Sequence, residues 1–242
     1  MKKQDSLSFN RLLSFCTSTD NEASDISGCW NIHTHRRKGD MRHAIWSCGW
    51  MEESILSECS DKAPFYISVG IHPWYLTEEN FPAQWQWLLR SVHDKRVLAI
   101  GEAGLDKAVK VPFDLQVSVF RQVAGLADEL RLPLVIHAVK ASNEIIRLKK
   151  EMNPHNPWII HGFRGKTELA QTYLQHDIYL SFGEKYQEES LCITPLDHLF
   201  LETDESETDI CELCRRTAKI RKIPEEELRE KIRQNINKLF FR

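Results

Sequence analysis

The sequence predicts an α/β protein, and more specifically a slightly irregular (β/α)8 TIM barrel. Short apolar runs alternate with amphipathic stretches along nearly all of its 242 residues, which is the pattern of βα units that build a parallel sheet. Eight apolar runs fit into this length, whereas an open doubly wound sheet usually needs fewer strands. We therefore expect one barrel domain over residues 29–242, preceded by a polar N-terminal extension, 1–28, that carries no motif.

Each expected strand is a short apolar run bounded by polar or turn-forming residues. The runs read CWNIHTH, HAIWSC, FYISVGIH and VLAIGE in the first half of the chain, and LPLVIH, PWIIHG, IYLSFG and HLFLETD in the second half. They predict strands, in chain order, over 29–35, 43–48, 65–72, 97–102, 132–137, 157–162, 178–183 and 198–204.

The amphipathic stretches between these runs predict the helices. In chain order the expected helices lie near 51–60, 82–93, 114–131, 141–151, 166–176, 206–221 and 224–238. Two connections are short. The seven residues between the first two strands cannot hold a crossover helix, and 183–197 leaves little room for one after the seventh strand. These two places make the expected barrel irregular.

Composition limits the possible partners. The chain is 42% hydrophobic and 28% charged, with a formal net charge of −3, so nucleic acid or an anionic membrane would have to be bound by a local patch. No run approaches the roughly 18 apolar residues that span a bilayer, and the opening residues are too polar for a signal peptide. We therefore expect a cytoplasmic protein with no membrane partner, and a monomer.

The cysteines point to the same compartment. Seven scattered cysteines, an odd number, fit a reducing environment better than a disulfide framework. Cys211 and Cys214 form a CxxC pair within the expected helix 206–221, with no second cysteine pair nearby. A structural role for this pair is therefore favoured over a zinc or redox role.

Side chains that bind metals or move protons recur at the ends of the expected strands. His33 and His35 share one face of the first strand, because side chains alternate along an extended chain. In a TIM barrel the carboxyl ends of all strands meet at one rim, so seven such side chains converge there: His33, His35, His72, Glu102, His137, His161 and Asp204. A single histidine there is more often a hydrogen-bonded structural residue, and Asp204 alone could cap a helix. Together they would be costly to desolvate without a cation, and they predict a metal site.

The kind and number of ligands predict the metals. Nitrogen and oxygen ligands without a thiolate suit zinc, manganese, nickel or iron, and magnesium is a further candidate. There are more ligands than one tetrahedral ion requires, so two divalent ions are favoured over one. Glu102 is the natural bridge between them, since a carboxylate has two oxygens. On this interpretation His33 and His35 share a face because both bind one ion.

Six motifs resemble, in order, those of the TatD-type metal-dependent deoxyribonucleases. They are HTH at 33–35, GIHP at 70–73, IGEAGLD at 100–106, LPLVIH at 132–137, IIHGFRG at 159–165 and LETD at 201–204. The resemblance runs from about residue 30 to the C-terminal NINKLFF and implies a TIM-barrel hydrolase of the amidohydrolase type. It also implies a ligand set in which His33, His35 and Asp204 bind one ion, His137 and His161 bind the other, and Glu102 is shared.

Other residues are candidates for supporting the metals or binding substrate. Glu202 lies two residues before Asp204, on the same strand face, where it could accept an N–H from a metal-binding imidazole. His72 and Arg164 are expected either to support the metal ligands or to bind substrate. The loops at this rim are basic on one side (Arg36, Arg37, Lys38, Lys107, Lys110, Lys140, Arg164 and Lys166) and acidic on the other (Glu184, Glu188, Glu189, Glu205 and Glu207). The basic half could bind phosphates, or the rim could be an ordinary solvated surface of mixed charge.

Three functions remain open on the sequence alone. The leading hypothesis is a two-metal hydrolase that cleaves phosphodiester bonds, in DNA or another phosphodiester substrate, with a metal-bound hydroxide as nucleophile and Asp204 assisting proton transfer. The second keeps the barrel and the metals but hydrolyses an amide or lactone ring. The third is a degenerate barrel that serves as a binding protein, and the intact set of ligands argues against it.

Overall fold

The computed structural model describes residues 28–37, 41–57 and 66–241, and within them the predicted barrel is confirmed. Eight parallel strands are hydrogen-bonded in the order in which they occur along the chain. They are β1 (Asn31–Thr34), β2 (Ala44–Cys48), β3 (Tyr66–Val69), β4 (Val97–Asp106), β5 (Leu134–Val139), β6 (Trp158–Ile160), β7 (Ile178–Phe182) and β8 (Leu199–Leu201). The expected N-terminal extension falls almost entirely on residues 1–27, which lie outside the described residues.

The barrel closes between β1 and the segment that follows β8. Thr34 forms a parallel bridge with Asp204, and the backbone N–H of Asp204 donates to the carbonyl of His33 over 3.0 Å. The N–H of His35 donates in turn to the carbonyl of Asp204, also over 3.0 Å. The chain therefore closes the sheet at the residues that the sequence marks as metal ligands.

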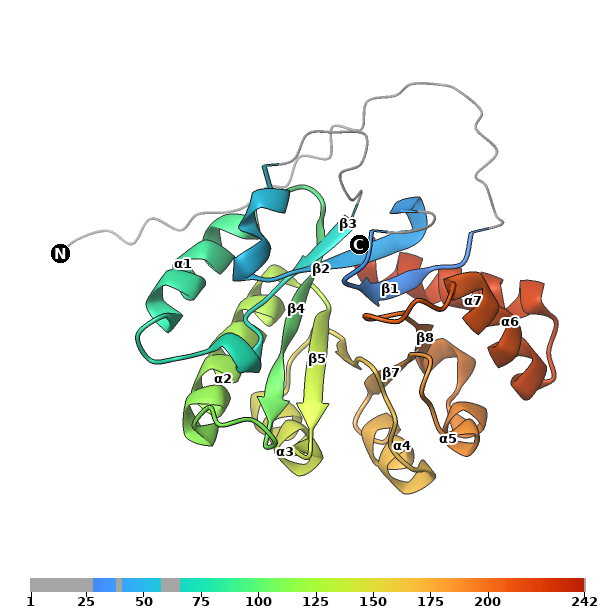
Figure 1. Cartoon of the computed structure of the whole chain (residues 1–242). Helices are drawn as coiled ribbons and strands as arrows, with labels where there is room; N and C mark the ends of the chain where they lie inside the picture. The colour runs from blue at the N-terminus through green and yellow to red at the C-terminus, as the bar shows by residue number, and fades with distance from the viewer. Residues whose placement is uncertain (1–27, 38–40, 58–65, 242) are drawn as a thin grey trace.

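Seven α-helices and four short 3-10 helices connect the described strands and follow the last one. In Figure 1 the α-helices lie outside the strands. The α-helices are α1 (Phe81–Ser91), α2 (Phe113–Leu130), α3 (Ser142–Met152), α4 (Thr167–Leu174), α5 (Glu188–Ile193), α6 (Ile210–Arg221) and α7 (Glu225–Phe240). The 3-10 helices are η1 (Met41–His43), η2 (Trp50–Ile55), η3 (Pro73–Tyr75) and η4 (Leu196–His198).

Three elements differ from the sequence prediction. The helix expected near 51–60 is the 3-10 helix η2, in which Glu52 has the non-helical angles φ −103° and ψ 20°; residues 58–60 lie outside the described part. The segment after the seventh strand holds α5, a helix of only six residues. Four consecutive polar residues, beginning at Gln187, interrupt the apolar pattern there, so the sequence does not predict it. The fourth strand does not end at Glu102 but continues to Asp106.

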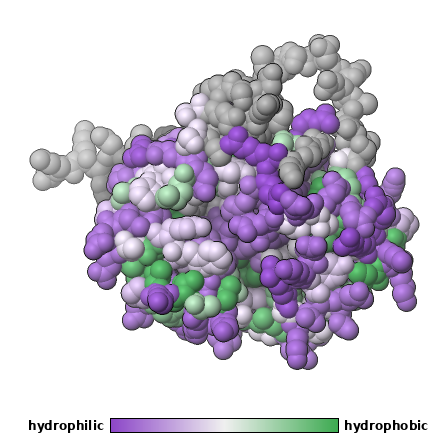
Figure 2. Space-filling view, in the orientation of Figure 1, coloured by the Kyte–Doolittle hydropathy of each residue, from purple (hydrophilic) through white to green (hydrophobic). Residues whose placement is uncertain are grey.

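The core lies on both sides of the strands. All three residues of β6 are buried, as expected for a parallel strand covered on one face by helices and on the other by the barrel interior. Phe120 of α2 packs edge-on against Trp158, with ring centroids 5.5 Å apart. Hydrophilic residues cover most of the face seen in Figure 2, and the hydrophobic residues in view form separate small areas. Among the described residues no helix is both long enough and apolar enough to cross a membrane.

Candidate metal centre

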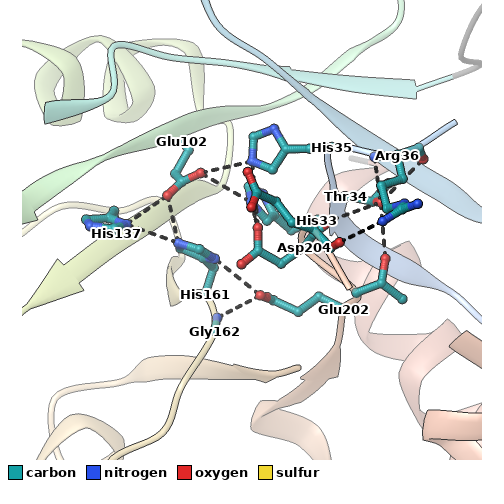
Figure 3. Close-up of polar contacts among 12 residues, drawn as sticks. His33, Thr34, His35, Arg36, Glu102, His137, His161, Gly162, Glu202 and Asp204 are labelled. Carbon is teal, nitrogen blue, oxygen red and sulfur yellow. Dashed lines mark hydrogen bonds and ion pairs between the residues drawn. The ribbon is translucent and has the colours of Figure 1, made fainter. Parts of the chain in front are cut away.

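The seven side chains predicted at the strand ends come together, with Glu102 among the others; Figure 3 labels all of them except His72. His33 lies in β1 and His35 directly after it, His161 directly follows β6, and Asp204 lies three residues after β8. Glu102 and His137 lie inside β4 and β5 rather than at their ends, because both strands end later than predicted. His72 lies three residues after β3, immediately before η3.

The two oxygens of the Glu102 carboxylate face two different groups of imidazoles. Oε2 lies 3.3 Å from Nε2 of His33 and 3.4 Å from Nε2 of His35. Oε1 lies 2.9 Å from Nδ1 of His137 and 2.8 Å from Nε2 of His161. The carboxylate is 6% exposed, so these contacts are shielded from water. One buried carboxylate therefore stands between a His33–His35 pair and a His137–His161 pair.

Asp204 joins the first of these pairs. Its Oδ1 lies 3.9 Å from Nε2 of His33 and 3.8 Å from Nε2 of His35, the same nitrogens that face Glu102. Its backbone has a positive φ of 53°, a left-handed conformation that Asp tolerates better than most residues. The hydrogen bonds of its N–H and carbonyl to β1 fix this conformation, and so the barrel closure also aims the carboxylate.

The second pair is oriented by two further carboxylates. Oδ2 of Asp106 lies 3.1 Å from Nε2 of His137, and Oε1 of Glu202 lies 3.2 Å from Nδ1 of His161. An imidazole that donates its N–H to such a carboxylate presents the lone pair of its other nitrogen, here Nδ1 of His137 and Nε2 of His161. Both of these nitrogens point at Oε1 of Glu102.

His72 differs from the other imidazoles in its tautomer. Its Nδ1 accepts a hydrogen bond from the backbone N–H of Trp74 over 3.1 Å, so in the neutral ring the proton is on Nε2. Nε2 then donates to Oε1 of Glu102 over 3.0 Å. Burial lowers the pKa of His72, which favours this neutral form. In this arrangement His72 holds Glu102 in place and offers no lone pair to a metal.

Gly101 lets the β4 backbone bring Glu102 into the centre. It has a positive φ of 135°, which L side chains rarely adopt. A Cβ atom at this position would lie 2.5 Å from the carbonyl oxygen of Val135 in β5. Any larger residue would therefore push β4 away from β5 and displace Glu102 relative to His137.

Charge is concentrated in this cluster. Burial opposes the ionised form of Glu102, but the surrounding imidazoles, above all His161, hold its pKa well below the ordinary value. Burial likewise opposes the charged form of His161, yet Glu102 and Glu202 hold its pKa well above the ordinary value. The pKa of His35 is also raised, because Glu102 and Asp204 outweigh its burial. The carboxylates of the centre therefore attract positive charge into a buried space.

The donor set fits divalent metal ions. His33 is fully buried, and neither of its ring nitrogens has a hydrogen-bond partner among the described residues. A buried polar nitrogen without a partner is costly, whereas a coordinating imidazole uses its lone pair. Ligand atoms of three residue groups come close enough to share an ion; the groups are His33, His35 and Glu102, then His72, Glu102 and His137, and finally His161, Glu202 and Asp204.

Sequence reasoning missed Asp106 and Trp74. Asp106 is 2% exposed, and its Oδ2 accepts a hydrogen bond from the indole N–H of Trp74 over 2.7 Å in addition to its contact with His137. The available signal was the spacing, because Asp106 lies four residues after Glu102 and alternation places both on one strand face. Because the predicted fourth strand ends at Glu102, the sequence-based prediction does not place Asp106 on the same strand face.

A cavity of about 240 Å³ opens beside the centre on the side of Asp204. Glu202 and Asp204 line it together with Arg164 and Lys185, so both signs of charge face it. The predicted candidate Arg164 thus lies beside two of the candidate side chains, Glu202 and Asp204, on the loop after β6.

The remaining basic residues of the rim are only partly available to a substrate. Arg36 donates to Oε1 of Glu207 over 2.6 Å and to the carbonyl of Glu205 over 3.2 Å, so it fastens the loop after β8. Lys107 forms an ion pair with Glu144. Lys38 lies outside the described residues. The basic side of the rim is therefore already in part neutralised by acidic neighbours.

Comparisons with known proteins agree with this geometry. The uncharacterized metal-dependent hydrolase YabD of Bacillus subtilis is 34% identical over 151 residues, which cover 57% of this chain and 58% of that protein. The 3'-5' ssDNA/RNA exonuclease TatD of a Rahnella species is 30% identical over 167 residues, 63% of each chain. The human 3'-5' RNA nuclease TATDN2 is 28% identical over 147 residues, 56% of this chain and 19% of that protein. The chain thus spans less than two thirds of the length of these relatives.

Solved structures share the fold. The Escherichia coli TatD homologue YJJV superimposes with a TM-score of 0.73 at 21% identity, covering 82% of this chain and 86% of that one. A TatD family hydrolase from Entamoeba histolytica gives a TM-score of 0.70 at 19% identity, covering 82% and 84%. The family model for TatD related DNases matches residues 31–241, which include every strand of the barrel and all seven side chains gathered around Glu102. This chain therefore belongs to the TatD-related DNase family.

Proposed function

We propose that this protein is a metal-dependent hydrolase that cleaves phosphodiester bonds in nucleic acid, and that it works with two divalent ions. The main support for the proposal is that the two oxygens of the Glu102 carboxylate face two different pairs of histidines. A carboxylate whose Oε2 faces His33 and His35, and whose Oε1 faces His137 and His161, has the arrangement of a bridge between two ions.

The described donors divide into two sets with one shared member. His33, His35 and Asp204 would hold one ion, His137 and His161 the other, and Glu102 both. Nitrogen and oxygen donors suit zinc, manganese, nickel or magnesium. Bound ions of this kind lower the pKa of a water molecule and stabilise negative charge on phosphate oxygens.

Side chains of the centre supply the other requirements of hydrolysis. Oδ1 of Asp204 faces His33 and His35, which leaves Oδ2 to accept the proton of an attacking water; this carboxylate is 30% exposed and lines the cavity. Arg164, which also lines the cavity, would bind a phosphate of the substrate. Asp106 and Glu202 keep the imidazoles of His137 and His161 in the tautomers that present lone pairs.

The relatives support nucleic acid as the substrate class. The Rahnella relative is named an exonuclease of single-stranded DNA and RNA, and the human relative is named an RNA nuclease. Single-stranded DNA is our first choice for this chain, because its motifs resemble those of TatD-type deoxyribonucleases. Hydrolysis of an amide or lactone ring uses the same kind of centre and becomes an outcome of the test.

The test compares substrates on metal-reloaded protein. We expect cleavage of an end-labelled single-stranded DNA oligonucleotide and no turnover of cyclic amides or lactones. By elemental analysis the wild type should hold about two more divalent ions per chain than Glu102→Gln. Glu102→Gln should abolish cleavage and lower occupancy of both ions, whereas His137→Ala should empty mainly one. His155→Ala is the matched control, since His155 is 90% exposed and contacts Asp128 instead of the centre.

Three results would contradict the proposal. Turnover of cyclic amides or lactones without cleavage of DNA or RNA would assign the centre to the other substrate class. Full activity of Glu102→Gln would remove the bridging role. A difference of only one ion per chain between the wild type and Glu102→Gln would remove the two-metal arrangement.

A further inference from the structure

A second cluster of metal-binding side chains lies outside the candidate metal centre. The Sγ atoms of Cys29 and Cys214 and a carboxylate oxygen of Glu225 all lie within 4.8 Å of one another. Cys29 precedes β1, Cys214 lies in α6, and Glu225 is the first residue of α7. Three segments that are distant in sequence therefore bring two thiols and one carboxylate to a single point.

Cys211 adds a third thiol. It lies three residues before Cys214 in α6, and residues at this spacing share one face of a helix. Its side chain interacts with that of Cys29. The CxxC pair has no second cysteine pair nearby in the sequence, but the fold brings the Cys29 thiol to it.

We propose that Cys29, Cys211, Cys214 and Glu225, here called the thiol cluster, bind one divalent cation that prefers sulfur ligands, such as zinc. Three thiolates and one carboxylate give the four ligands that structural zinc sites require. Cys29 is 6% exposed and Cys214 is 1% exposed, whereas Cys211 and Glu225 are partly exposed, so the site lies at the edge of the core. Four protein ligands would leave no open position for a substrate. A closed site of this kind stabilises a fold and does not catalyse.

The charges around the thiol cluster suit a bound cation. Nε of Arg229 donates to Oε1 of Glu225 over 3.1 Å, and Nε of Arg215 lies 3.9 Å from Oε2 of the same carboxylate. Three thiolates and one carboxylate carry four negative charges, and a divalent ion with these two guanidinium groups carries four positive ones. The cluster is therefore neutral as a whole when it holds a divalent ion.

The acidity of the thiols agrees with this arrangement. A hydrogen bond from Cys29, together with the positive charge of Arg229, lowers the pKa of Cys214 in spite of its burial. Burial and the neighbouring Cys29 thiol raise the pKa of Cys211 to about 11. The hydrogen bond with Cys214 and burial raise the pKa of Cys29 well above its ordinary value. A bound cation would therefore displace the protons of Cys29 and Cys211, as thiolate coordination requires.

A cation explains the composition of the thiol cluster better than a disulfide does. A disulfide would join two of the three cysteines and leave the third thiol without a role. A cation uses all four side chains and ties the start of β1 to α6 and α7. Cys29 lies four residues before His33, about 13 Å along an extended strand, so the site shares no ligand with the candidate metal centre.

Cobalt titration of the reduced, metal-free full chain tests the proposal. Thiolate ligands give Co²⁺ an intense sulfur-to-metal charge-transfer absorption in the near ultraviolet, which imidazole and carboxylate ligands do not produce. We expect this band to appear and to saturate at one ion per chain. It should be lost in Cys29→Ser and in Cys214→Ser, and it should persist in the control Cys192→Ser, which changes an exposed cysteine elsewhere, and in His161→Ala.

Alkylation of the wild-type chain gives a second measurement that needs no variant to fold. One equivalent of zinc beyond that held by the candidate metal centre should protect the partly exposed Cys211 from iodoacetamide, as read by peptide mass spectrometry, and leave the exposed Cys192 reactive. Absence of the charge-transfer band, or its persistence in both serine variants, would overturn the proposal. A disulfide between Cys29 and either helix cysteine in freshly purified, metal-free protein would assign the thiol cluster to redox chemistry instead.

Discussion

Asp106 offers the sharpest test of how the second imidazole pair is oriented. Its carboxylate is buried and accepts three hydrogen bonds: Oδ2 from Trp74 over 2.7 Å and from His137 over 3.1 Å, and Oδ1 from the N–H of Ala108 over 2.7 Å. Asp106→Asn keeps the shape but replaces one acceptor oxygen with an amide donor. If that amide faces His137, Nε2 must accept and the ring proton moves to Nδ1, where it occupies the lone pair that points at Glu102.

The size of the effect follows from this contact. A hydrogen bond to a charged group contributes about 1.5–3 kcal/mol, and about 1.4 kcal/mol corresponds to a factor of ten in binding. We therefore expect Asp106→Asn to weaken the ion assigned to His137 and His161 by about tenfold to a hundredfold, which is also the usual range for losing a carboxylate behind a metal-binding histidine. The ion assigned to His33, His35 and Asp204 should be held almost as tightly as before.

Competition between the protein and a chromogenic chelator measures the two affinities separately. Asp128→Asn is the matched control, because Asp128 also accepts two backbone N–H groups, those of His155 and Asn156, away from the centre. Thermal melting checks that both variants are folded. Wild-type affinity for both ions in Asp106→Asn would refute the reasoning, and equal weakening of both would show that Asp106 supports the shared carboxylate instead.

Three further predictions concern pH, substrate binding and helix stability. Glu102 has a lowered pKa in the folded protein, so its contribution to folding stability is complete above pH 4.5 and is lost as the pH falls. His161 has a raised pKa in the folded protein, so its contribution is complete below pH 6.5 and is lost as the pH rises. The melting temperature of the metal-free protein should therefore be highest between these values, and a steady rise into the alkaline range would contradict this. Arg164→Ala should raise KM for an oligonucleotide and reduce the slope of log KM against log salt by about 1, without changing turnover of a nitrophenyl phosphodiester; parallel loss of both activities would place Arg164 in support of the metals. Asp209→Ala should lower the free energy of unfolding by about 1 kcal/mol in urea titrations, because the Asp209 carboxylate caps α6 through the N–H groups of Cys211 and Glu212; no change would exclude the cap as a stabilising contact.

The predictable part of the centre depends on local regularities. Side chains alternate along a strand, and the carboxyl ends of parallel strands meet at one rim, so His33, His35 and His161 could be placed together from the sequence. The same rule places Glu202 on the face of Asp204, and the structure brings its carboxylate to Nδ1 of His161. These relations need only the strand positions, and the strands are the elements that the apolar runs mark most clearly.

The missed part depends on contacts that no local pattern encodes. Gly104 sits between Glu102 and Asp106 and suggests a turn, whereas in the structure its lack of a side chain is what lets β4 approach β5: a Cβ there would lie 1.9 Å from the carbonyl oxygen of His137. Cys29 meets Cys214 only because the barrel closes and returns the last helices to the first strand. Distances of this kind follow from the closed fold and cannot be obtained from spacing along the chain.

The bridge between Thr34 and Asp204, which closes the barrel, determines when the candidate metal centre can form during synthesis of the chain. A growing chain that has just passed His161 already contains every predicted donor except Asp204, but it lacks β7, β8 and the peptide that bridges back to β1. The first and the newest strand then both have an open edge, and no carboxylate stands opposite His33 and His35 beyond Glu102. The same peptide later shuts the ring and delivers the missing carboxylate. A truncated product that ends before Thr203 therefore has neither a closed barrel nor a complete centre.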